Sequence, residues 1–297
     1  MKYFVTGVGG QLGYDVVNEL KKRGHGCIGS DILESCENLD VEYCRLDITD
    51  SCAVSDAIKA YSPDVVIHCA AWTAVDAAED EENQKKVYAI NVSGTQNISN
   101  TCKEIDCRMI YISTDYVFDG KGETPWEPDC RDFAPQNYYG ETKLLGENAV
   151  RETLQKFFIV RIAWVFGKNG NNFVKTMLNL SKKYPSLRVV CDQIGTPTYT
   201  YDLARLLVDM SETEKYGCYH ATNEGGFISW YDFAKEIFKS AGVQIEVNPV
   251  TTAEYGVSKA ARPFNSRLNK SKLSENGFTP LPDWRDALAR YLKEISE

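Results

Sequence analysis

The stretch Thr6-Gly7-Val8-Gly9-Gly10-Gln11-Leu12-Gly13 decides the fold, because a strand-like run precedes it and a helical pattern follows it. Glycines at positions 7, 10 and 13 permit a tight turn, close approach of the backbone to a diphosphate, and close packing of helix on strand. The free N–H groups at the start of a helix attract an anion. A glycine-rich turn is weak evidence alone, but this one has the strand-to-helix context that a dinucleotide-binding turn requires.

Short apolar runs alternate with helical patterns through the first half of the chain. The expected strands cover residues 3–6, 27–31, 43–46, 65–69, 109–113 and 157–162. The helices expected between them include residues 12–20, 53–60 and 82–103. Apolar strands joined by helices indicate a parallel sheet that is covered on both faces. The sequence therefore predicts an α/β fold of the doubly wound Rossmann type.

After the sixth expected strand the pattern becomes less regular, which predicts a smaller lobe and a chain that crosses back to the sheet. Further helices are expected at residues 173–182, 203–210, 230–241 and 284–295. Short strands are expected at residues 187–190, 218–221 and 245–250, and a loop at residues 121–137. We assign the Rossmann domain to residues 1–166 and 197–222. The smaller C-terminal, substrate-binding lobe is assigned to residues 167–196 and 223–297.

Composition narrows the class of protein. A chain of 297 residues with 43% hydrophobic content can bury a sizeable core. No apolar run approaches the ~20 residues that span a bilayer. Met1 and Lys2 lead straight into the first strand without a secretory signal, so we expect a soluble, cytoplasmic protein with no membrane partner. The net charge of −9 opposes general affinity for nucleic acid.

The ten cysteines and three histidines form no recognisable metal or disulfide pattern. The cysteines are scattered from Cys27 to Cys218 without a C-x-x-C pair, so reduced thiols are expected. The histidines are isolated from one another, and no zinc site is predicted. His68 lies inside an apolar run and is interpreted as a core histidine.

Two acidic residues follow expected strands where a dinucleotide would contact them. Asp31 ends the second strand, 18 residues after Gly13, near the position of the acid that binds the adenosine ribose. Its carboxylate would repel a 2′-phosphate, so NADH is slightly preferred over NADPH, although Arg45 could reach such a phosphate. Asp47 could accept a hydrogen bond from the adenine amine, or it could cap the helix that follows.

The segment Tyr138-Tyr139-Gly140-Glu141-Thr142-Lys143 places a phenol and an ammonium group four residues apart. On a helix, Tyr139 and Lys143 would share one face. At about 4 Å and an effective dielectric of about 20, their attraction is about 4 kcal/mol, which would bring the pKa of the phenol from about 10 towards neutrality. Such pairs also occur without chemistry. Thr114, at the carboxyl end of an expected strand, favours a catalytic site, because ligands bind there.

These features together resemble the extended short-chain dehydrogenase/reductase family. Segments in order along nearly the whole chain are similar to the dTDP-4-dehydrorhamnose reductases, namely residues 10–13, 73–79, 113–120, 161–166, 192–198 and 262–268. The resemblance implies a sugar-nucleotide substrate. It implies reduction of the 4-keto group of dTDP-4-dehydro-L-rhamnose to dTDP-L-rhamnose, with hydride from NADH or NADPH.

The resemblance also implies roles for individual residues. Tyr139 would donate the proton, Lys143 would tune Tyr139, and Thr114 would polarise the carbonyl. Cofactor contacts are implied for Gly7, Gly9, Gly10, Gln11, Leu12, Gly13, Asp31, Asp47, Ile48, Ala70, Ala71, Trp72, Tyr139 and Lys143. Substrate contacts are implied for Thr73, Val75, Thr114, Asp115, Tyr116, Tyr139, Trp164, Arg262, Asn265 and Arg267.

Several alternatives stay open. Trp164 could cover an apolar sugar face or be a core aromatic, and Arg262 and Arg267 could bind a diphosphate or form exposed salt bridges. Some relatives dimerise around magnesium held by carboxylates. Asp15 is one candidate ligand, but no matching carboxylate follows Thr198, so magnesium is possible but not expected, and the protein could be a monomer or a homodimer. An NAD-retaining epimerase or dehydratase, or a non-catalytic regulatory subunit, would share the same fold.

Overall fold

A computed structural model of the protein describes residues 1–36, 39–256 and 258–296. Seven strands form its main sheet: β1 (Lys2–Thr6), β2 (Gly26–Asp31), β3 (Glu42–Arg45), β4 (Val65–His68), β5 (Arg108–Thr114), β6 (Phe157–Ile162) and β11 (Gly217–His220). All neighbours are parallel, in the order β11-β6-β5-β4-β1-β2-β3. This order is that of a Rossmann sheet with one strand added beside β6, so the predicted fold class is confirmed.

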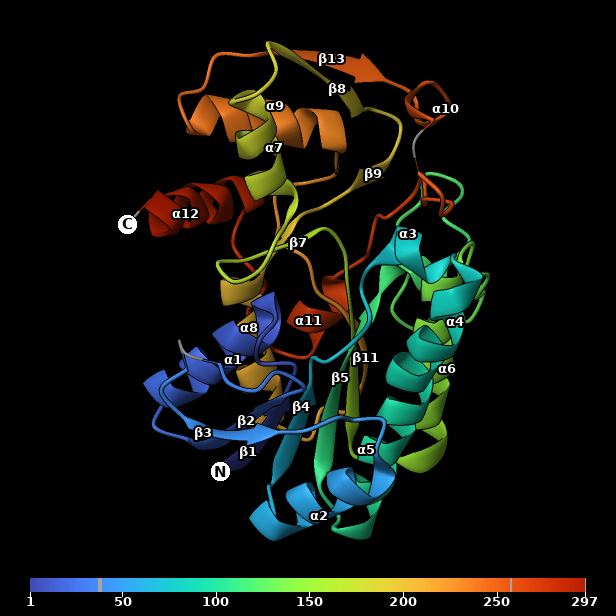
Figure 1. Cartoon of the computed structure of the whole chain (residues 1–297), viewed down its shortest axis with the longest axis vertical. Coiled ribbons are helices and arrows are strands. Elements are labelled where there is room, and N and C mark those ends of the chain that lie inside the picture. Colours follow the sequence, from blue (N-terminus) through green and yellow to red (C-terminus); the bar gives the residue numbers. More distant parts are fainter. Residues whose placement is uncertain (37–38, 257, 297) are drawn as a thin grey trace.

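Helices cover both faces of this sheet (Figure 1). On one face α1 (Gln11–Lys22) packs beside α8 (Thr200–Ser211), and their apolar residues join those of the strands in one core. On the other face lie α2 (Ser51–Tyr61), α5 (Thr95–Glu104) and α6 (Tyr138–Thr153), with a second core beneath them. The two cores explain why the sheet strands are apolar throughout rather than alternating.

The helix predicted at residues 82–103 is present but is divided into three segments. These are α4 (Glu81–Tyr88), a π-helical segment η1 (Ala89–Gly94) and α5, and a short helix α3 (Val75–Ala78) precedes them. The π-helical segment carries Asn91, whose side chain accepts a hydrogen bond from the backbone N–H of Trp72 at 2.8 Å and donates one to Thr142 at 3.1 Å. Hydrophobic periodicity did not predict this local widening of the helix.

A smaller group of elements lies beyond one end of the sheet, at the top of Figure 1. Strands β8 (Ser186–Val190) and β13 (Glu246–Val250) pair in parallel over α7 (Phe173–Ser181), α9 (Trp230–Ser240) and α12 (Trp284–Ser296). Their buried side chains, Phe233 and Trp284 among them, form a third core. Two short pairs accompany this group: β7 (Val165–Phe166) with β10 (Thr198–Tyr199), and β9 (Ile194–Gly195) with β12 (Ile228–Ser229).

The remaining elements are the short helices η2 (Asp115–Val117), α10 (Thr252–Tyr255) and α11 (Ser271–Glu275). Residues 121–137 contain no helix or named strand, as predicted. Leu273 of α11 packs into the core under the large sheet, together with Phe278 and Leu281. The division into residues 1–166 with 197–222 and residues 167–196 with 223–297 remains a proposal. All ten cysteines are free thiols. None of the helices in the described ranges is long and apolar enough to cross a membrane.

Candidate active site

The glycine-rich turn between β1 and α1 forms part of the wall of a cavity of about 570 Å³. Gly7 has a φ of +71°, and a Cβ there would lie 2.6 Å from the backbone nitrogen of Ala70, so only glycine fits. Helix α1 begins without a side-chain cap, whereas Asp50 caps α2 and Asn137 caps α6. The N–H groups at the start of α1 therefore remain available, and this set of donors fits the diphosphate of a dinucleotide.

Two acidic side chains line the same cavity: Asp31 is the last residue of β2, and Asp47 follows β3. The carboxylate of Asp31 accepts a hydrogen bond from the backbone N–H of Gly9 at 2.9 Å, which fixes it beside the glycine turn. Asp47 accepts hydrogen bonds from the backbone and the hydroxyl of Thr49 at 2.9 and 2.8 Å, and the cap of α2 is Asp50. Arg45, the possible partner of a 2′-phosphate, pairs instead with the exposed Glu34 at 2.8 Å.

Helix α6 brings Tyr139 to the cavity because a glycine follows it. A Cβ at Gly140 would lie 2.4 Å from the carbonyl oxygen of Tyr116, so the absence of a side chain lets α6 approach η2 closely. Asn137 fixes the start of the helix by accepting a hydrogen bond from the backbone N–H of Gly140 at 2.8 Å. The rings of Tyr116 and Tyr139 meet edge to face, with centroids 5.6 Å apart.

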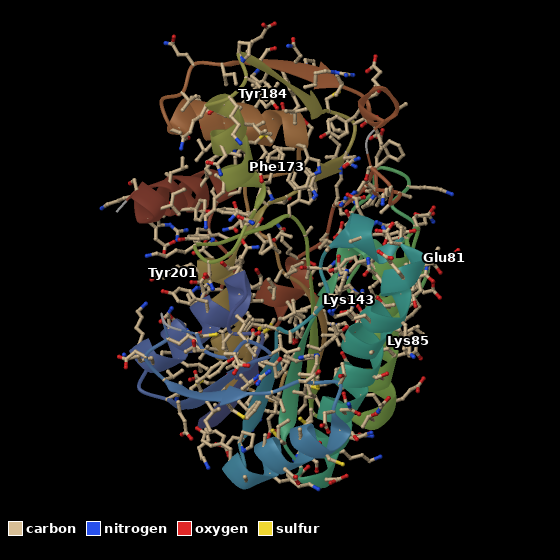
Figure 2. The ribbon with its side chains drawn as sticks, in the orientation of Figure 1. Glu81, Lys85, Lys143, Phe173, Tyr184 and Tyr201 are labelled. Carbon is tan, nitrogen blue, oxygen red and sulfur yellow. The ribbon has the colours of Figure 1, made fainter. Side chains whose placement is uncertain are left out.

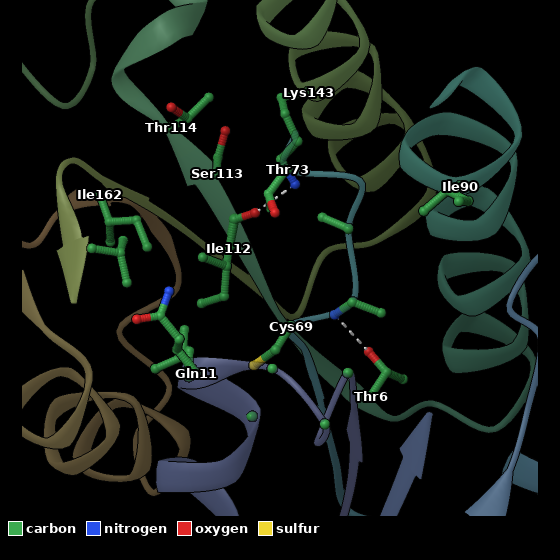
Figure 3. Close-up of a pocket in the computed structure, with 18 of the residues that line it drawn as sticks. Thr6, Gln11, Cys69, Thr73, Ile90, Ile112, Ser113, Thr114, Lys143 and Ile162 are labelled. Atoms are coloured by element: carbon green, nitrogen blue, oxygen red, sulfur yellow. Dashed lines mark hydrogen bonds between the residues drawn. The ribbon is translucent and has the colours of Figure 1, made fainter. Parts of the chain in front are cut away.

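Lys143 lies one turn further along α6 and is buried between the helix and the sheet (Figure 2). Glu81 and Lys85, by contrast, lie on the outer surface of α4. The Lys143 ammonium donates a hydrogen bond to the carbonyl oxygen of Ile112 at 2.8 Å (Figure 3). It also lies 4.1 Å from the ring centroid of Tyr111. Burial lowers the pKa of Lys143 to about 7.

The electrostatics of Tyr139 differ from the prediction. Burial raises the pKa of this phenol above its ordinary value, the charge of Asp115 raises it further, and the Thr114 hydroxyl acts to lower it. This direction is opposite to the expectation that Lys143 brings the pKa towards neutrality, because burial has the largest effect on the phenol and the Lys143 ammonium is bound to the carbonyl oxygen of Ile112. A raised pKa keeps the phenol protonated, which is the state that a proton donor requires.

Thr114 and Asp115 complete this corner of the cavity at the end of β5. The Thr114 hydroxyl donates to one carboxylate oxygen of Asp115 at 3.0 Å. The other oxygen, Oδ2, is buried and has no hydrogen-bond partner among the described residues. Burial raises the pKa of Asp115 to about 6. The Ser266 hydroxyl acts to lower this pKa, so it lies close to the carboxylate. Because buried polar groups are normally paired, the oxygen without a hydrogen bond is available to accept one from a ligand.

A second cavity, of about 320 Å³, adjoins the first. Tyr116 lines both cavities, and Trp164 of the first stacks on Trp230 of the second, with ring centroids 3.8 Å apart. Trp164 has a φ of +52°, a backbone conformation that costs a non-glycine residue about 1–2 kcal/mol. Trp164 therefore lines a cavity and also packs on another aromatic ring, so both roles considered for it stay open.

The first cavity brings together most of the residues that the sequence singled out. They are Gly7, Gly9, Gly10, Gln11, Leu12, Gly13, Asp31, Asp47, Ile48, Ala70, Ala71, Thr73, Val75, Thr114, Asp115, Tyr116, Tyr139, Lys143 and Trp164. Trp72 does not line it, and its indole N–H donates to the carbonyl oxygen of Ala74 at 3.0 Å. Arg262 lines the second cavity.

Asn265 and Arg267 line neither cavity. The buried amide of Asn265 donates to the carbonyl oxygens of Lys121 and Thr124 at 3.1 and 2.9 Å, so it holds the 121–137 loop. Arg267 donates to the side-chain oxygen of Asn265 at 3.1 Å. These contacts give the two residues a structural role, and the substrate contacts that the resemblance implied for them stay predictions.

Sequence reasoning missed several residues of the second cavity, which include Phe173, Arg188, Gln193 and Trp230. Phe173 and Trp230 are the first residues of α7 and α9, and aromatic residues at the start of helical patterns carry no signal of a ligand surface. Cys69, Ser113 and Ile112 of the first cavity were noted as parts of strands or motifs, without a site role.

Asp15, the residue considered for metal binding, and the tyrosine that follows Thr198 are bound to other protein groups. One carboxylate oxygen of Asp15 accepts a hydrogen bond from the Thr200 hydroxyl, and Tyr199 donates to Glu294 at 2.7 Å. No group of three or more histidine, cysteine, aspartate or glutamate side chains in the described ranges could hold a metal ion. His68 is buried, with its two ring nitrogens 2.7 and 3.2 Å from the hydroxyls of Thr6 and Thr95, and is a core histidine.

Comparison with known proteins decides the family. The family model described as RmlD substrate binding domain matches residues 1–297. The chain belongs to this family. A dTDP-4-dehydrorhamnose reductase of Shigella flexneri is 38% identical over 307 aligned positions, which cover 99% of this chain and 98% of the relative. The spore coat polysaccharide biosynthesis protein SpsK of Bacillus subtilis is 39% identical, with coverage of 99% and 98%.

Solved structures of this family agree. A dTDP-4-dehydrorhamnose reductase of Clostridium acetobutylicum superimposes with a TM-score of 0.92 and 40% identity over the full length of both chains. The Bacillus anthracis dTDP-4-dehydrorhamnose reductase in complex with NADP has a TM-score of 0.87 and 39% identity, covering 99% of this chain and all of that one. The resemblance to the dTDP-4-dehydrorhamnose reductases is confirmed, and with it the prediction of a nicotinamide-dependent oxidoreductase.

Proposed function

We propose that the protein reduces the 4-keto group of dTDP-4-dehydro-L-rhamnose to give dTDP-L-rhamnose, with NADH or NADPH as the hydride donor. One observation carries this proposal. Thr114, Tyr139 and Lys143 meet on the wall of the same cavity that contains the glycine turn and Asp31. Relatives at 36–40% identity over nearly the whole chain bear the corresponding reductase name, which supports the substrate class.

The nicotinamide cofactor, when bound, supplies hydride to the carbonyl carbon of the sugar. The residues of this chain polarise and protonate the oxygen of the same carbonyl. Tyr139, kept protonated by burial, gives its proton to that oxygen as the C–O double bond becomes a single bond. The Thr114 hydroxyl polarises the carbonyl beforehand. The tyrosinate left behind regains a proton from solvent, and the nearby Lys143 ammonium stabilises it meanwhile.

The second cavity is proposed to hold the nucleotide part of the substrate. Phe173 and Trp230 offer flat aromatic surfaces for a pyrimidine base, and their ring centroids lie 4.6 Å apart. Arg188 and Arg262 supply positive charge for a diphosphate. Tyr116 lines both cavities, so one ligand could extend from the nucleotide region to the Tyr139 hydroxyl.

NADH is proposed as the slightly preferred cofactor. The Asp31 carboxylate is fixed at the turn where the adenosine ribose would lie, and it disfavours an additional phosphate there. Arg45 is paired with Glu34 and is not committed to such a phosphate. The relative from Bacillus anthracis was solved with NADP, so the preference is a property to be measured for this chain.

A direct assay tests the proposed function. Purified protein is mixed with dTDP-4-dehydro-L-rhamnose and either NADH or NADPH, with and without chelator, and both loss of reduced cofactor and formation of dTDP-L-rhamnose are followed. Stoichiometric formation of product with added cofactor supports the reductase. Conversion of sugar nucleotides without added cofactor, by protein that retains NAD, would instead establish an epimerase or dehydratase. Cofactor binding without turnover would establish a regulatory subunit, and loss of activity with chelator would establish a metal requirement.

A further inference from the structure

Helix α6 carries four functional side chains at intervals of four residues: Tyr139, Lys143, Glu147 and Arg151. Residues four apart are neighbours on a helix surface, so the four form one row that winds along α6, and the buried Lys143 and Glu147 in its middle face the sheet. A Cβ at Gly146 would lie 2.2 Å from the hydroxyl of Tyr111, which shows how closely this part of α6 approaches β5. The row continues directly from the proposed proton donor into the interior.

Glu147 is fully buried and is bound by donors from three directions. Arg161 of β6, also fully buried, donates through Nε and Nη2 to the two carboxylate oxygens at 2.7 and 2.8 Å. Arg151 donates through Nη2 at 2.7 Å, and the hydroxyl of Ser113 donates at 2.6 Å. Although burial acts to raise it, the Arg161 guanidinium brings the pKa of Glu147 down to about 2. The carboxylate is therefore a fixed negative charge.

The groups that face Lys143 come from three elements. Tyr111 lies on β5, His68 and Cys69 lie at the end of β4, and Glu147 lies on α6 itself. Burial lowers the pKa of His68 to about 3 and raises that of Cys69 to about 12, so both are neutral at physiological pH. Glu147 therefore supplies the opposite charge that favours the ammonium form of Lys143, against the effect of burial.

We infer that Glu147 is a positioning residue for the proposed reduction: its clamped carboxylate, one turn beyond Lys143 on α6, keeps that lysine in its ammonium form. A buried ion pair is weak evidence for stability, because replacement by apolar residues is often neutral. The location of this pair gives it a different use. It lies behind the lysine of the active site, and its Ser113 donor is the neighbour of Thr114. This inference rests on the proposed roles of Tyr139 and Lys143.

The test measures the charge of Lys143 directly. Protein whose lysines carry ¹³C at Cε is titrated by NMR, and the Lys143→Arg variant identifies the signal. We expect Glu147→Gln to lower the titration midpoint of Lys143 by about one pH unit or more, the usual effect of a lost opposite charge. Glu147→Asp, which retains the charge, should titrate near the wild-type midpoint. Ser113→Ala, which removes only a neutral donor, should leave that midpoint in place.

Activity provides the second readout. The alkaline limb of the kcat profile of Glu147→Gln should move to lower pH by the same amount as the NMR midpoint, and Glu147→Asp should restore it. An unchanged Lys143 midpoint in Glu147→Gln would overturn the inference, even if kcat falls, because a purely structural role lowers kcat without moving the titration. If the wild type does not reduce the sugar nucleotide, the proposed function fails, while the lysine titration still decides the charge role of Glu147.

Folding of the variants is checked first by chemical denaturation. Glu147→Gln leaves Arg161 buried with a neutral partner, a change that can unfold a protein. The double variant Glu147→Gln with Arg161→Met removes both charges of the buried pair, while Arg151, whose side chain is 13% exposed, keeps its contact with Cys218. The Lys143 midpoint should again fall below the wild-type value in this double variant. A midpoint equal to that of the wild type would contradict the inference.

Discussion

The hydroxyl of Tyr116 accepts a hydrogen bond from Arg262 at 3.1 Å, and this contact joins η2 at the end of the large sheet to the C-terminal segment of the chain. Arg262 also pairs with Asp76 of α3 at 2.6 Å. The guanidinium is therefore held at the boundary between the two cavities, with Tyr116 lining both of them. This placement fits an arginine that exchanges a protein carboxylate for the diphosphate of a ligand.

Replacing Arg262 by methionine should weaken binding of the sugar nucleotide. We expect KM for this substrate to rise about ten- to a hundredfold, since a hydrogen bond to a charged group contributes about 1.5–3 kcal/mol. KM for the cofactor should stay unchanged. Arg285→Gln is the control, because Arg285 is an exposed arginine that lines neither cavity. Steady-state kinetics with each substrate varied in turn give these values. Equal KM values for the sugar nucleotide in the two variants would contradict a contact between Arg262 and the diphosphate.

Asp31→Ser should shift cofactor preference towards NADPH. Removing the carboxylate at the ribose position relieves its repulsion of a 2′-phosphate, and we expect the NADPH to NADH ratio of kcat/KM to rise about tenfold, or about 1.4 kcal/mol. Asp40→Asn is the matched control, because its side chain is 90% exposed and lies outside the cavity. If the NADPH to NADH ratio of kcat/KM is the same in wild type and Asp31→Ser, Asp31 does not discriminate between the two cofactors at the ribose.

Gly7 and Gly122 have similar backbone conformations, but only Gly7 lies in the proposed cofactor site. Comparing alanine variants of the two separates the effect of backbone strain on stability from the effect on cofactor binding. Gly7→Ala adds a Cβ 2.6 Å from the backbone of Ala70 at a φ of +71°, whereas Gly122→Ala adds one in open space at a φ of +74°. Both should lose about 1–2 kcal/mol of unfolding free energy to the backbone conformation. Gly7→Ala should lose more, and it alone should bind NADH more weakly in a fluorescence titration. Equal stability and equal cofactor affinity of the two variants would contradict the account of the turn.

His68 should make the protein less stable in acid. Burial lowers its pKa from 6.5 to about 3, so between these values the unfolded chain binds a proton that the folded protein does not. The contribution of His68 to the free energy of unfolding is therefore fully present above about pH 6.5. It decreases as the pH falls below that value, by up to about 1.4 kcal/mol per pH unit. His68→Asn, which does not titrate, should flatten the pH dependence of the unfolding free energy in urea. Parallel curves for the two proteins would rule this out.

Much of the fold could be predicted because the strands of the large sheet are buried on both faces. Continuous apolar runs such as Val65 to Ile67 stand out from the helical patterns around them. The π-helical segment at Ala89–Gly94 could not be predicted, because it depends on the contacts of Asn91 with Trp72 and Thr142, which are distant in sequence.

The site could be predicted where a sequence motif fixes the backbone conformation, as in the glycine turn. It was less predictable where tertiary packing determines the direction and the pKa of a side chain. Spacing placed Lys143 one turn from Tyr139, yet the structure directs its ammonium to the carbonyl of Ile112, and burial determines the pKa values of both residues. Asn265 matched a motif, but the fold uses its amide to hold a loop.

The most direct test of the account is the turnover of Tyr139→Phe, which removes one hydroxyl and keeps the ring. Formation of dTDP-L-rhamnose and the affinity for NADH are measured on the same preparation, next to wild type. We expect kcat to fall about 10²- to 10⁴-fold, the usual contribution of a positioned proton donor, while the Kd for NADH stays within about twofold. A variant that turns over at the wild-type rate would contradict the assignment of Tyr139 as the proton donor.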